Sequence, residues 1–261
     1  MFRTLLLSTV AAVGISGAAL AADLPQRLPP PEPPPVFTWT GFYLGVNSGY
    51  AWQSKSASCS DIDGTYCPAS FSDEVNYYGV ALGAKPHGAI YGGQVGYNWQ
   101  LYSGFVIGVE ADLSGFFQMS DTTTHVESYD YFHTSRTKYD LFGTVRGRLG
   151  YAWGPALFYV TGGWAWANVK DSFTEYSTLA GAVYGAVDSS NNASGWTVGG
   201  GMEYMFAPHW TLKTEYLYAS LGDRNVDITP AYYGDPTRAG DVYGHFPHKL
   251  NIFRSGINYK F

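Results

Sequence analysis

Nine charged side chains stand within otherwise apolar or glycine-rich stretches of this sequence, where they could serve acid–base chemistry or pair with one another. A buried carboxylate beside a base can transfer protons, and a row of such groups can conduct ions. Four acids and five bases make up the set, and a nearly balanced charge favours structural ion pairing over either activity. The residues are Glu110, Asp112, Arg146, Arg148, Glu203, Lys213, Glu215, Arg254 and Lys260.

Histidine and tyrosine residues in two polar stretches form a second candidate site. His125, Tyr129 and His133 lie in the first stretch, and His245 and His248 lie in the second. Imidazole and phenolate are both axial ligands of haem iron, so these residues could hold hemin at a surface. Their spacing does not make a metal cage. Ordinary solvated loop residues are the favoured interpretation, and hemin binding is the alternative.

Catalytic motifs do not appear in the sequence. It contains neither a G-x-S-x-G nucleophile motif nor an H-E-x-x-H zinc motif. Three consecutive glycines at 199–201 lie inside an expected strand, where close backbone packing explains them better than a phosphate cradle. The formal charge of -6 and the lack of a basic stripe argue against nucleic acid as a partner. We therefore expect no enzyme, no metal and no cofactor apart from the hemin alternative.

The elements that must position the nine charges are β-strands, because bulky apolar residues alternate with small or polar ones at a period of two. The final stretch shows this clearly, with Phe253, Ile257 and Tyr259 alternating against Arg254 and Asn258. A half-buried strand has this pattern. The same alternation predicts eight strands, at about 41–52, 87–101, 105–116, 139–153, 156–167, 195–206, 210–221 and 251–261.

Short turns and long polar stretches alternate between these strands. The long stretches, which we expect to be loops, cover about 53–86, 117–138, 168–194 and 222–248. This order predicts an all-β fold, an eight-stranded antiparallel up-and-down transmembrane β-barrel over 38–261. A soluble barrel with its bulky face inside is the alternative. Only 14% of residues are charged, and the small face is rich in Gly, Ala, Thr and Asn, so we place the bulky face in lipid.

The amino terminus predicts export. Arg3 precedes an apolar run, and the small residues at 19–21 form a cleavage pattern, so residues 1–21 read as a cleaved signal peptide. A membrane anchor is less suited to so short a run. Residues 22–37 are a proline-rich leader, which favours a stiff periplasmic spacer. In an exported chain, Cys59 and Cys67 predict a disulfide within one loop.

Four motifs resemble the outer-membrane immunogenic protein family, which comprises small OmpA-type, opacity-like barrels of Gram-negative envelopes. They are WTGFYLG at 39–45, GGQVGYN at 92–98, VRGRLGY at 145–151 and GINYKF at 256–261. The resemblance implies an outer-membrane location, contact with lipid and lipopolysaccharide, and Phe261 as a signal to the assembly machinery. It implies a role in envelope structure and surface presentation, with hemin binding, known for some relatives, as an alternative. A small diffusion pore is a second alternative, which a narrow lumen plugged by the ion-pair network disfavours. The partners of the loops are not predicted.

Overall fold

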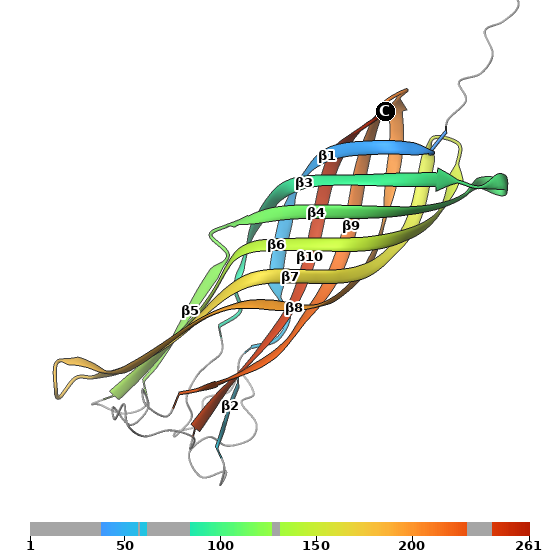
Figure 1. Cartoon of the computed structure of the whole chain (residues 1–261). Coiled ribbons are helices and arrows are strands. Elements are labelled where there is room, and N and C mark those ends of the chain that lie inside the picture. The colour runs from blue at the N-terminus through green and yellow to red at the C-terminus, as the bar shows by residue number, and fades with distance from the viewer. Residues whose placement is uncertain (1–37, 57, 62–83, 127–130, 229–241) are drawn as a thin grey trace, which may run out of the picture. The chain divides into compact units, whose positions relative to one another are not determined.

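The computed structural model describes residues 38–56, 58–61, 84–126, 131–228 and 242–261 (Figure 1). The predicted signal peptide and proline-rich leader lie outside the described residues. Cys67 and the side chain of Cys59 also lie outside them, so the disulfide stays a prediction. Among the described residues, no helix is long and apolar enough to cross a membrane.

Strands make up nearly all of the described chain, and the one helix is a short 3-10 turn, η1, at Tyr102–Gly104. Figure 1 shows the strands side by side around one barrel. Their bounds are β1 Gly41–Gln53, β2 Ser58–Asp61, β3 His87–Gln100, β4 Phe105–Phe117, β5 Ser120–Val126, β6 Tyr131–Trp153, β7 Ala156–Ser177, β8 Ala182–Ala207, β9 Trp210–Asp227 and β10 Val242–Lys260.

Eight of these strands close into a ring in which each strand pairs antiparallel with the next. The order is β1-β3-β4-β6-β7-β8-β9-β10, and β10 returns to β1, for example through Tyr259 opposite Leu44. The two remaining strands prolong ring members. Strand β5 continues β4 along β6, after a kink at Gln118 (φ 53°), and β2 continues β1 along β10. The predicted eight-stranded up-and-down barrel is confirmed.

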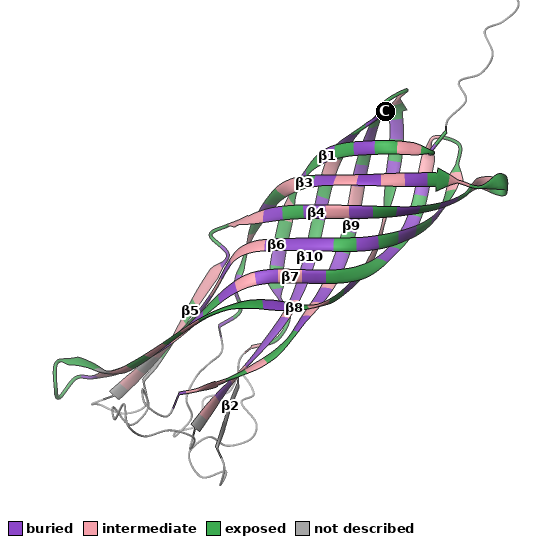
Figure 2. Cartoon of the chain, in the orientation of Figure 1, coloured by how far each residue is buried: buried purple, intermediate pink, exposed green. Residues whose placement is uncertain are grey.

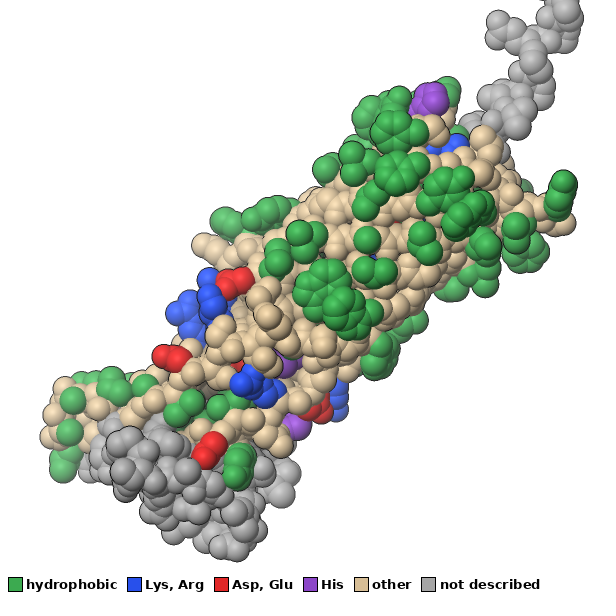
Figure 3. Space-filling model, viewed as in Figure 1, with side chains coloured by type: hydrophobic (Ala, Val, Ile, Leu, Met, Phe, Trp, Pro, Cys, Tyr) green, Lys and Arg blue, Asp and Glu red, His purple; other side chains and the backbone are tan. Residues whose placement is uncertain are grey.

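Burial alternates along the ring strands as the sequence predicts (Figure 2). In β1, Leu44 and Val46 are exposed on the outside, whereas Tyr43 and Asn47 are buried inside. The bulky face therefore points outward around the ring. Figure 3 shows hydrophobic side chains spread over this wall, with charged side chains gathered towards the loop end.

Two girdles of aromatic side chains bound the apolar wall. Trp99, Tyr151 and Trp210 are exposed at the end of the short turns, and Trp164 and Trp196 are exposed at the other end. Aromatic residues gather at both interfaces of outer-membrane barrels, where short turns face the periplasm and longer connections face outward. The end with the long connections is therefore extracellular.

The strands continue beyond the second girdle into stretches that the sequence analysis assigns to loops. Strand β6 begins at Tyr131, β7 runs to Ser177, β8 begins at Ala182 and β10 begins at Val242. Strand β2 likewise lies within 53–86, so all four stretches, at 53–86, 117–138, 168–194 and 222–248, are partly strand. On the outside of this part, Lys138 and Lys170 each lie 2.8 Å from a carboxylate oxygen of Asp140, so its outer surface is charged and water-exposed. We call the strand segments beyond the second girdle the outer extension.

The outer extension divides into two sheets. Pairing of β8 with β9 ends at Trp196 opposite Ser220, whereas pairing of β7 with β8 continues to Ser177 opposite Ala182. One sheet therefore contains β5, β6, β7 and β8, and the other contains β9, β10 and β2. In Figure 1 the two sheets separate below the ring.

Candidate functional site

The charged residues of the lumen come from strands that place acids directly opposite bases. Glu110 on β4 lies opposite Arg146 on β6, and Glu215 on β9 lies opposite Arg254 on β10. Opposite charges at such cross-strand positions attract each other. The period-two alternation then directs all of these side chains to the inside of the ring.

Arg146 and Arg254 share their carboxylate partners. Arg146 Nη2 lies 3.0 Å from Asp112 Oδ2, and its Nη1 lies 3.2 Å from Glu215 Oε2. Arg146 Nη2 also contacts Glu110 Oε1 at 2.5 Å. Arg254 Nη1 lies 2.9 Å from Asp112 Oδ1, and its Nη2 lies 2.6 Å from Glu215 Oε1. Each guanidinium thus binds more than one carboxylate, which couples the pairs into one network.

Lys213 and Arg148 extend the network towards the periplasmic end. Lys213 Nζ lies 2.7 Å from Glu110 Oε1, and Arg148 Nη2 lies 2.9 Å from Glu203 Oε2. Four acids and four bases are therefore connected, and each is at most 5% exposed. Lys260, the ninth charged residue of the sequence analysis, makes no ion pair with any residue that the structure describes.

Polar side chains add further hydrogen bonds to the network, and the sequence analysis did not assign them to the site. Tyr43 Oη donates to Glu110 at 2.6 Å and accepts from Arg148 at 2.9 Å. Tyr159 Oη donates to Glu215 at 3.1 Å, and its ring centroid lies 4.1 Å from the Arg148 guanidinium carbon. The two tyrosines lie on the small-residue face of their strands, and an aromatic ring among small residues is the signal that could have found them.

Glycines on the inner face make room for these side chains. A Cβ atom on Gly45 would lie 2.0 Å from Asn258 Oδ1, and one on Gly108 would lie 2.3 Å from Asn98 Oδ1. Both distances are too short for real contacts, so a larger residue would displace lumen side chains. The glycine-rich face of the sequence is therefore the face that accommodates the polar interior.

Buried apolar side chains lie on both sides of the ion network. On the extracellular side, Ile90, Phe142, Leu217 and Ile252 belong to one buried cluster. On the periplasmic side, Trp39, Val106, Leu157, Tyr159 and Met205 form another. The network therefore lies between two apolar layers.

A second polar cluster lies beyond the extracellular apolar layer, in the outer extension. Tyr139 Oη donates to Gln53 Oε1 at 2.8 Å and lies 3.0 Å from His248 Nδ1. His248 Nε2 lies 3.6 Å from Asp171 Oδ2, and Thr137 donates to Asp171 at 2.9 Å. The period-two alternation of the expected strand at about 139–153 predicts Tyr139 on the bulky outer face, and this prediction is wrong because Tyr139 is buried. An irregularity in the β6–β7 register between Tyr139 and Leu141 directs Tyr139 inward.

Burial shifts the pKa values of the two titratable groups of this cluster, Asp171 and His248, in opposite directions. It raises the pKa of Asp171 to about 6, although the hydrogen bond from Thr137 and the charge of Arg224 act against the rise. Burial also lowers the pKa of His248 to about 4, and Arg224 acts in the same direction. A group that loses its charge is easier to keep out of water, which explains both directions.

The residues named as candidate hemin ligands occupy different environments. His248 is 2% exposed inside the barrel, so it does not form a surface site with His245. The His245 side chain is 38% exposed and contacts Asn225 and Asp223. His125 and His133 are directly opposite each other in the β5–β6 register, and Tyr129 lies outside the described residues. No group of three or more metal-binding side chains occurs among the described residues.

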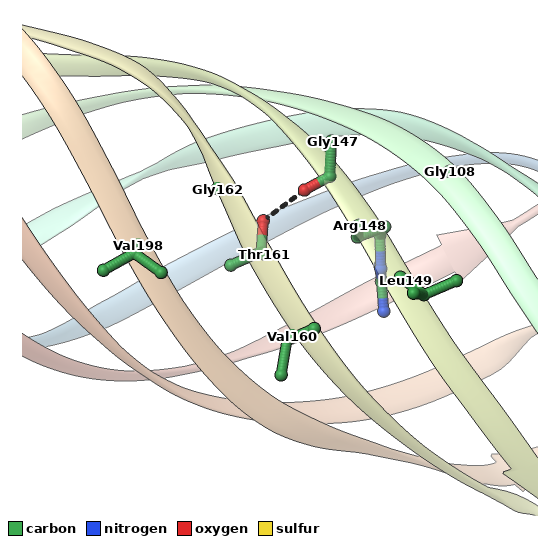
Figure 4. Close-up of a pocket in the computed structure, with 8 residues that line it drawn as sticks. All are labelled: Gly108, Gly147, Arg148, Leu149, Val160, Thr161, Gly162 and Val198. Carbon is green, nitrogen blue, oxygen red and sulfur yellow. Dashed lines mark hydrogen bonds between the residues drawn. The ribbon is translucent and has the colours of Figure 1, made fainter.

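A hollow of about 380 Å³ lies in the outer wall of the ring (Figure 4). Gly147 and Gly162 lack side chains there, and the exposed Leu149, Val160 and Val198 surround them. These three side chains are on the lipid side, so the hollow opens outward and is not a passage through the lumen.

Known proteins match the chain along nearly its whole length. The family model for the outer membrane protein beta-barrel domain matches residues 8–261. A 31 kDa outer-membrane immunogenic protein of Brucella melitensis is 33% identical, with 99% of this chain and 100% of the relative covered. A 22 kDa outer membrane protein of Rhizobium leguminosarum bv. viciae is 32% identical over 74% of this chain and 70% of the relative.

Solved structures show a fold likeness at low identity. The outer membrane protein OprG of Pseudomonas aeruginosa aligns with 12% identity and a TM-score of 0.46, covering 85% of this chain and 97% of that one. The family assignment rests instead on the sequence matches. The chain belongs to the outer membrane protein beta-barrel family, among relatives named outer-membrane immunogenic proteins, and its location is the outer membrane of a Gram-negative bacterium.

Proposed function

We propose that this protein is a structural barrel of the outer membrane with a plugged lumen, which presents its outer extension and loops at the cell surface. The observation that supports the proposal is the lumen itself. Eight buried charges are connected there, and apolar layers lie on both sides. Eight strands leave an interior that side chains can fill.

Physical reasoning disfavours a diffusion pore. A hydrated ion would have to cross two apolar layers and separate ion pairs that lie away from water. Breaking a buried ion pair by removing one partner costs about 3–5 kcal/mol, because a charge is left uncompensated. The network contains several such pairs joined through shared carboxylates, so its opening requires more than one of them to separate.

Single-channel recording tests this proposal. We expect the refolded protein to leave a planar lipid bilayer silent, and we expect Arg146→Ala, which breaks three ion pairs, to raise conductance or to prevent folding. A heat-modifiable band on unheated gels would show that the barrel has formed. Stable wild-type conductance that changes in Arg146→Ala would overturn the plugged lumen and favour the small pore.

The terminal Phe261 is proposed as the signal to the assembly machinery, and its side chain supports this by being 66% exposed at the end of β10. Phe261→Ala should lower the amount of barrel assembled in cells, because the exposed aromatic ring is lost. The same variant should refold in detergent like the wild type. A refolding defect of equal size would assign the residue to barrel stability instead.

Surface hemin binding is the second candidate function, and one observation favours it. His125 and His133 are directly opposite each other in the β5–β6 register, so two imidazole-bearing residues are neighbours on adjacent strands. This function predicts saturable hemin binding that shifts the haem absorbance band and that weakens in His125→Ala and His133→Ala. The buried His248 supplies the control, since His248→Ala should not change a surface site. Unsaturable binding, or equal loss in all three variants, would count against this function.

A further inference from the structure

A chain of polar contacts, which comprises two hydrogen bonds and one histidine–carboxylate contact of 3.6 Å, crosses the lumen where the two sheets of the outer extension begin to separate. It runs from Gln53 on β1 through Tyr139 on β6 to His248 on β10, and then to Asp171 on β7. Tyr139 and Asp171 belong to the sheet of β5, β6, β7 and β8, whereas His248 belongs to the sheet of β9, β10 and β2. The chain is therefore a contact between the two sheets.

The donor and the acceptor of each hydrogen bond in this chain are fixed. Gln53 Nε2 donates to the Lys55 carbonyl at 2.6 Å, so Gln53 Oε1 is the amide atom that faces Tyr139. Oε1 only accepts, and the single hydroxyl proton of Tyr139 is therefore donated to it. The Tyr139 oxygen must then accept from His248 Nδ1, 3.0 Å away. Neutral His248 consequently carries its proton on Nδ1.

The contact between His248 and Asp171 needs one more proton to become attractive. With Nδ1 protonated, neutral His248 presents a lone pair from Nε2 to Asp171 Oδ2 at 3.6 Å. Two acceptors that face each other repel, and a proton on either atom makes the contact attractive. Thr137 already donates to Asp171 Oδ1, so the other carboxylate oxygen is the one that is available to His248.

We propose that His248 and Asp171 hold one shared proton, and that this one-proton bridge keeps the two extracellular sheets together with little dependence on pH in mildly acidic solution. Neither residue needs to be exposed for this role, and each side chain is 3% exposed.

The surrounding groups are consistent with a single proton. Strand β7 adds Glu175, which is buried four residues beyond Asp171. Strand β9 contributes Asp223 and Arg224, whose charges act on His248 in opposite directions. Lys249 on β10 lies 3.6 Å from Asp223, which places that carboxylate beside a cation. Tyr139 of β6 and Gln53 of β1 stay uncharged across this range.

Proton counting explains the expected insensitivity to pH. In the closed state burial places the pKa of Asp171 at about 6 and that of His248 at about 4, so the pair holds one proton between these values, on Asp171. In an opened, hydrated state the ordinary values of 3.8 for Asp and 6.5 for His also give one proton, carried by His. Equal proton counts in the two states mean that pH does not shift the equilibrium.

Removing either residue should reveal the pH dependence that the remaining residue contributes to the opening of the sheets. In Asp171→Asn, the lowered pKa of His248 remains, and proton uptake favours opening, so the sheets should open as the pH falls from 6.5 to 4. In His248→Gln, the raised pKa of Asp171 remains, and proton loss favours opening, so the sheets should open as the pH rises from 4 to 6. A difference of about two pKa units corresponds to roughly a 100-fold change in the opening equilibrium.

Hydrogen exchange of the full mature chain in detergent measures this opening. The amides of β7 and β10 in the outer extension are followed between pH 4 and 7, with correction for the intrinsic exchange rate. In the wild type we expect an opening equilibrium constant that hardly changes with pH. In the two single variants it should change with pH in opposite directions. In the double variant it should again be independent of pH, but larger than in the wild type. The control is His245→Gln on the same strand, which should behave like the wild type.

Three results would overturn the proposal. Both single variants could remain independent of pH, both could change in the same direction, or His245→Gln could change as much as His248→Gln. If His248→Gln does not refold, the slope of Asp171→Asn and the behaviour of Tyr139→Phe decide the question. Tyr139→Phe breaks the chain without adding a titratable group, so it should increase opening at every pH and leave the slope near zero.

Discussion

The membrane-spanning ring and the outer extension are built from the same strands, but they differ on both faces. In the ring, the outer face is apolar and the inner face carries the ion network. In the extension, the outer face carries charged groups such as Lys138, Asp140 and Lys170, and the inner face mixes apolar residues with a few polar ones. The difference shows that lipid imposes a strict alternation on a strand, whereas water on the outside removes that requirement.

The two regions also differ in closure. Every ring strand has a neighbour on both sides, which is required because unpaired backbone groups in hydrocarbon cost several kcal/mol each. In the extension, the segment of β8 from Ala182 to Ser194 pairs with β7 only, among the strands that the structure describes. Water can hydrogen-bond an exposed edge, so the extension can separate into two sheets and the ring cannot.

The largest expected effect comes from breaking the charge balance inside the ring. Arg254→Met removes one cation that binds both Asp112 and Glu215. Arg146 still contacts both carboxylates, but the buried network then holds one uncompensated negative charge, and we expect a loss of about 3–5 kcal/mol in unfolding free energy. Urea unfolding of the refolded barrel, followed by tryptophan fluorescence, measures it. The control is Lys260→Met, which removes the same charge where no ion pair is described. Equal losses in the two variants would mean that the network does not stabilise the ring.

An effect of intermediate size on unfolding free energy should distinguish the lipid-facing surface of the ring from the water-facing surface of the outer extension. Met202 faces lipid about midway between the girdle residue Trp196 and the end of β8 at Ala207, and Met202→Lys should cost about 2–4 kcal/mol in a bilayer. Ser190 is exposed on the same strand beyond the girdle, and Ser190→Lys should stay within about 0.5 kcal/mol. Reversible unfolding from lipid vesicles compares the two. A penalty of similar size at both positions would move the membrane boundary into the extension.

The smallest effect should come from the exposed ion pairs of the extension. Asp140→Asn removes two lysine contacts at the surface, where such pairs contribute at most about 1 kcal/mol. Hydrogen bonds from Lys138 and Lys170 lower the pKa of Asp140, so its contribution is present at neutral pH and is lost as the pH falls through that lowered value. Unfolding at low and at 1 M salt should show the difference shrinking with salt. A loss that is large or independent of salt would show that the site is not solvent-screened.

Local patterns in the sequence were sufficient for the ring. The outer residues of β1 could be assigned because lipid selects bulky apolar groups at every second position. The same alternation collects acids and bases on the inner face, so the membership of the network, apart from Lys260, could be listed. The two tyrosines, Tyr43 and Tyr159, were on the correct face but were not recognised as hydrogen-bond partners.

The extension could not be predicted in the same way. Residues 168–194 carry polar groups on both faces, so the period-two signal that identifies a half-buried strand is absent there. Tyr139 was assigned to the wrong face, because one register irregularity reverses every side chain that precedes it on the strand. His248 was read as a surface residue since its polar neighbours in sequence are typical of loops.

The sequence by itself determined eight strands, their lipid-facing and inner faces, and a near balance of charge inside. Those features depend on residue type and on a spacing of two, which are local properties of the chain. Only the tertiary structure decided which acid meets which base, where the two extracellular sheets part, and how Tyr139, His248 and Asp171 join them. Arg254 and Asp112, for example, are 142 residues apart in sequence, and their contact exists only because the ring closes with one particular stagger of its strands.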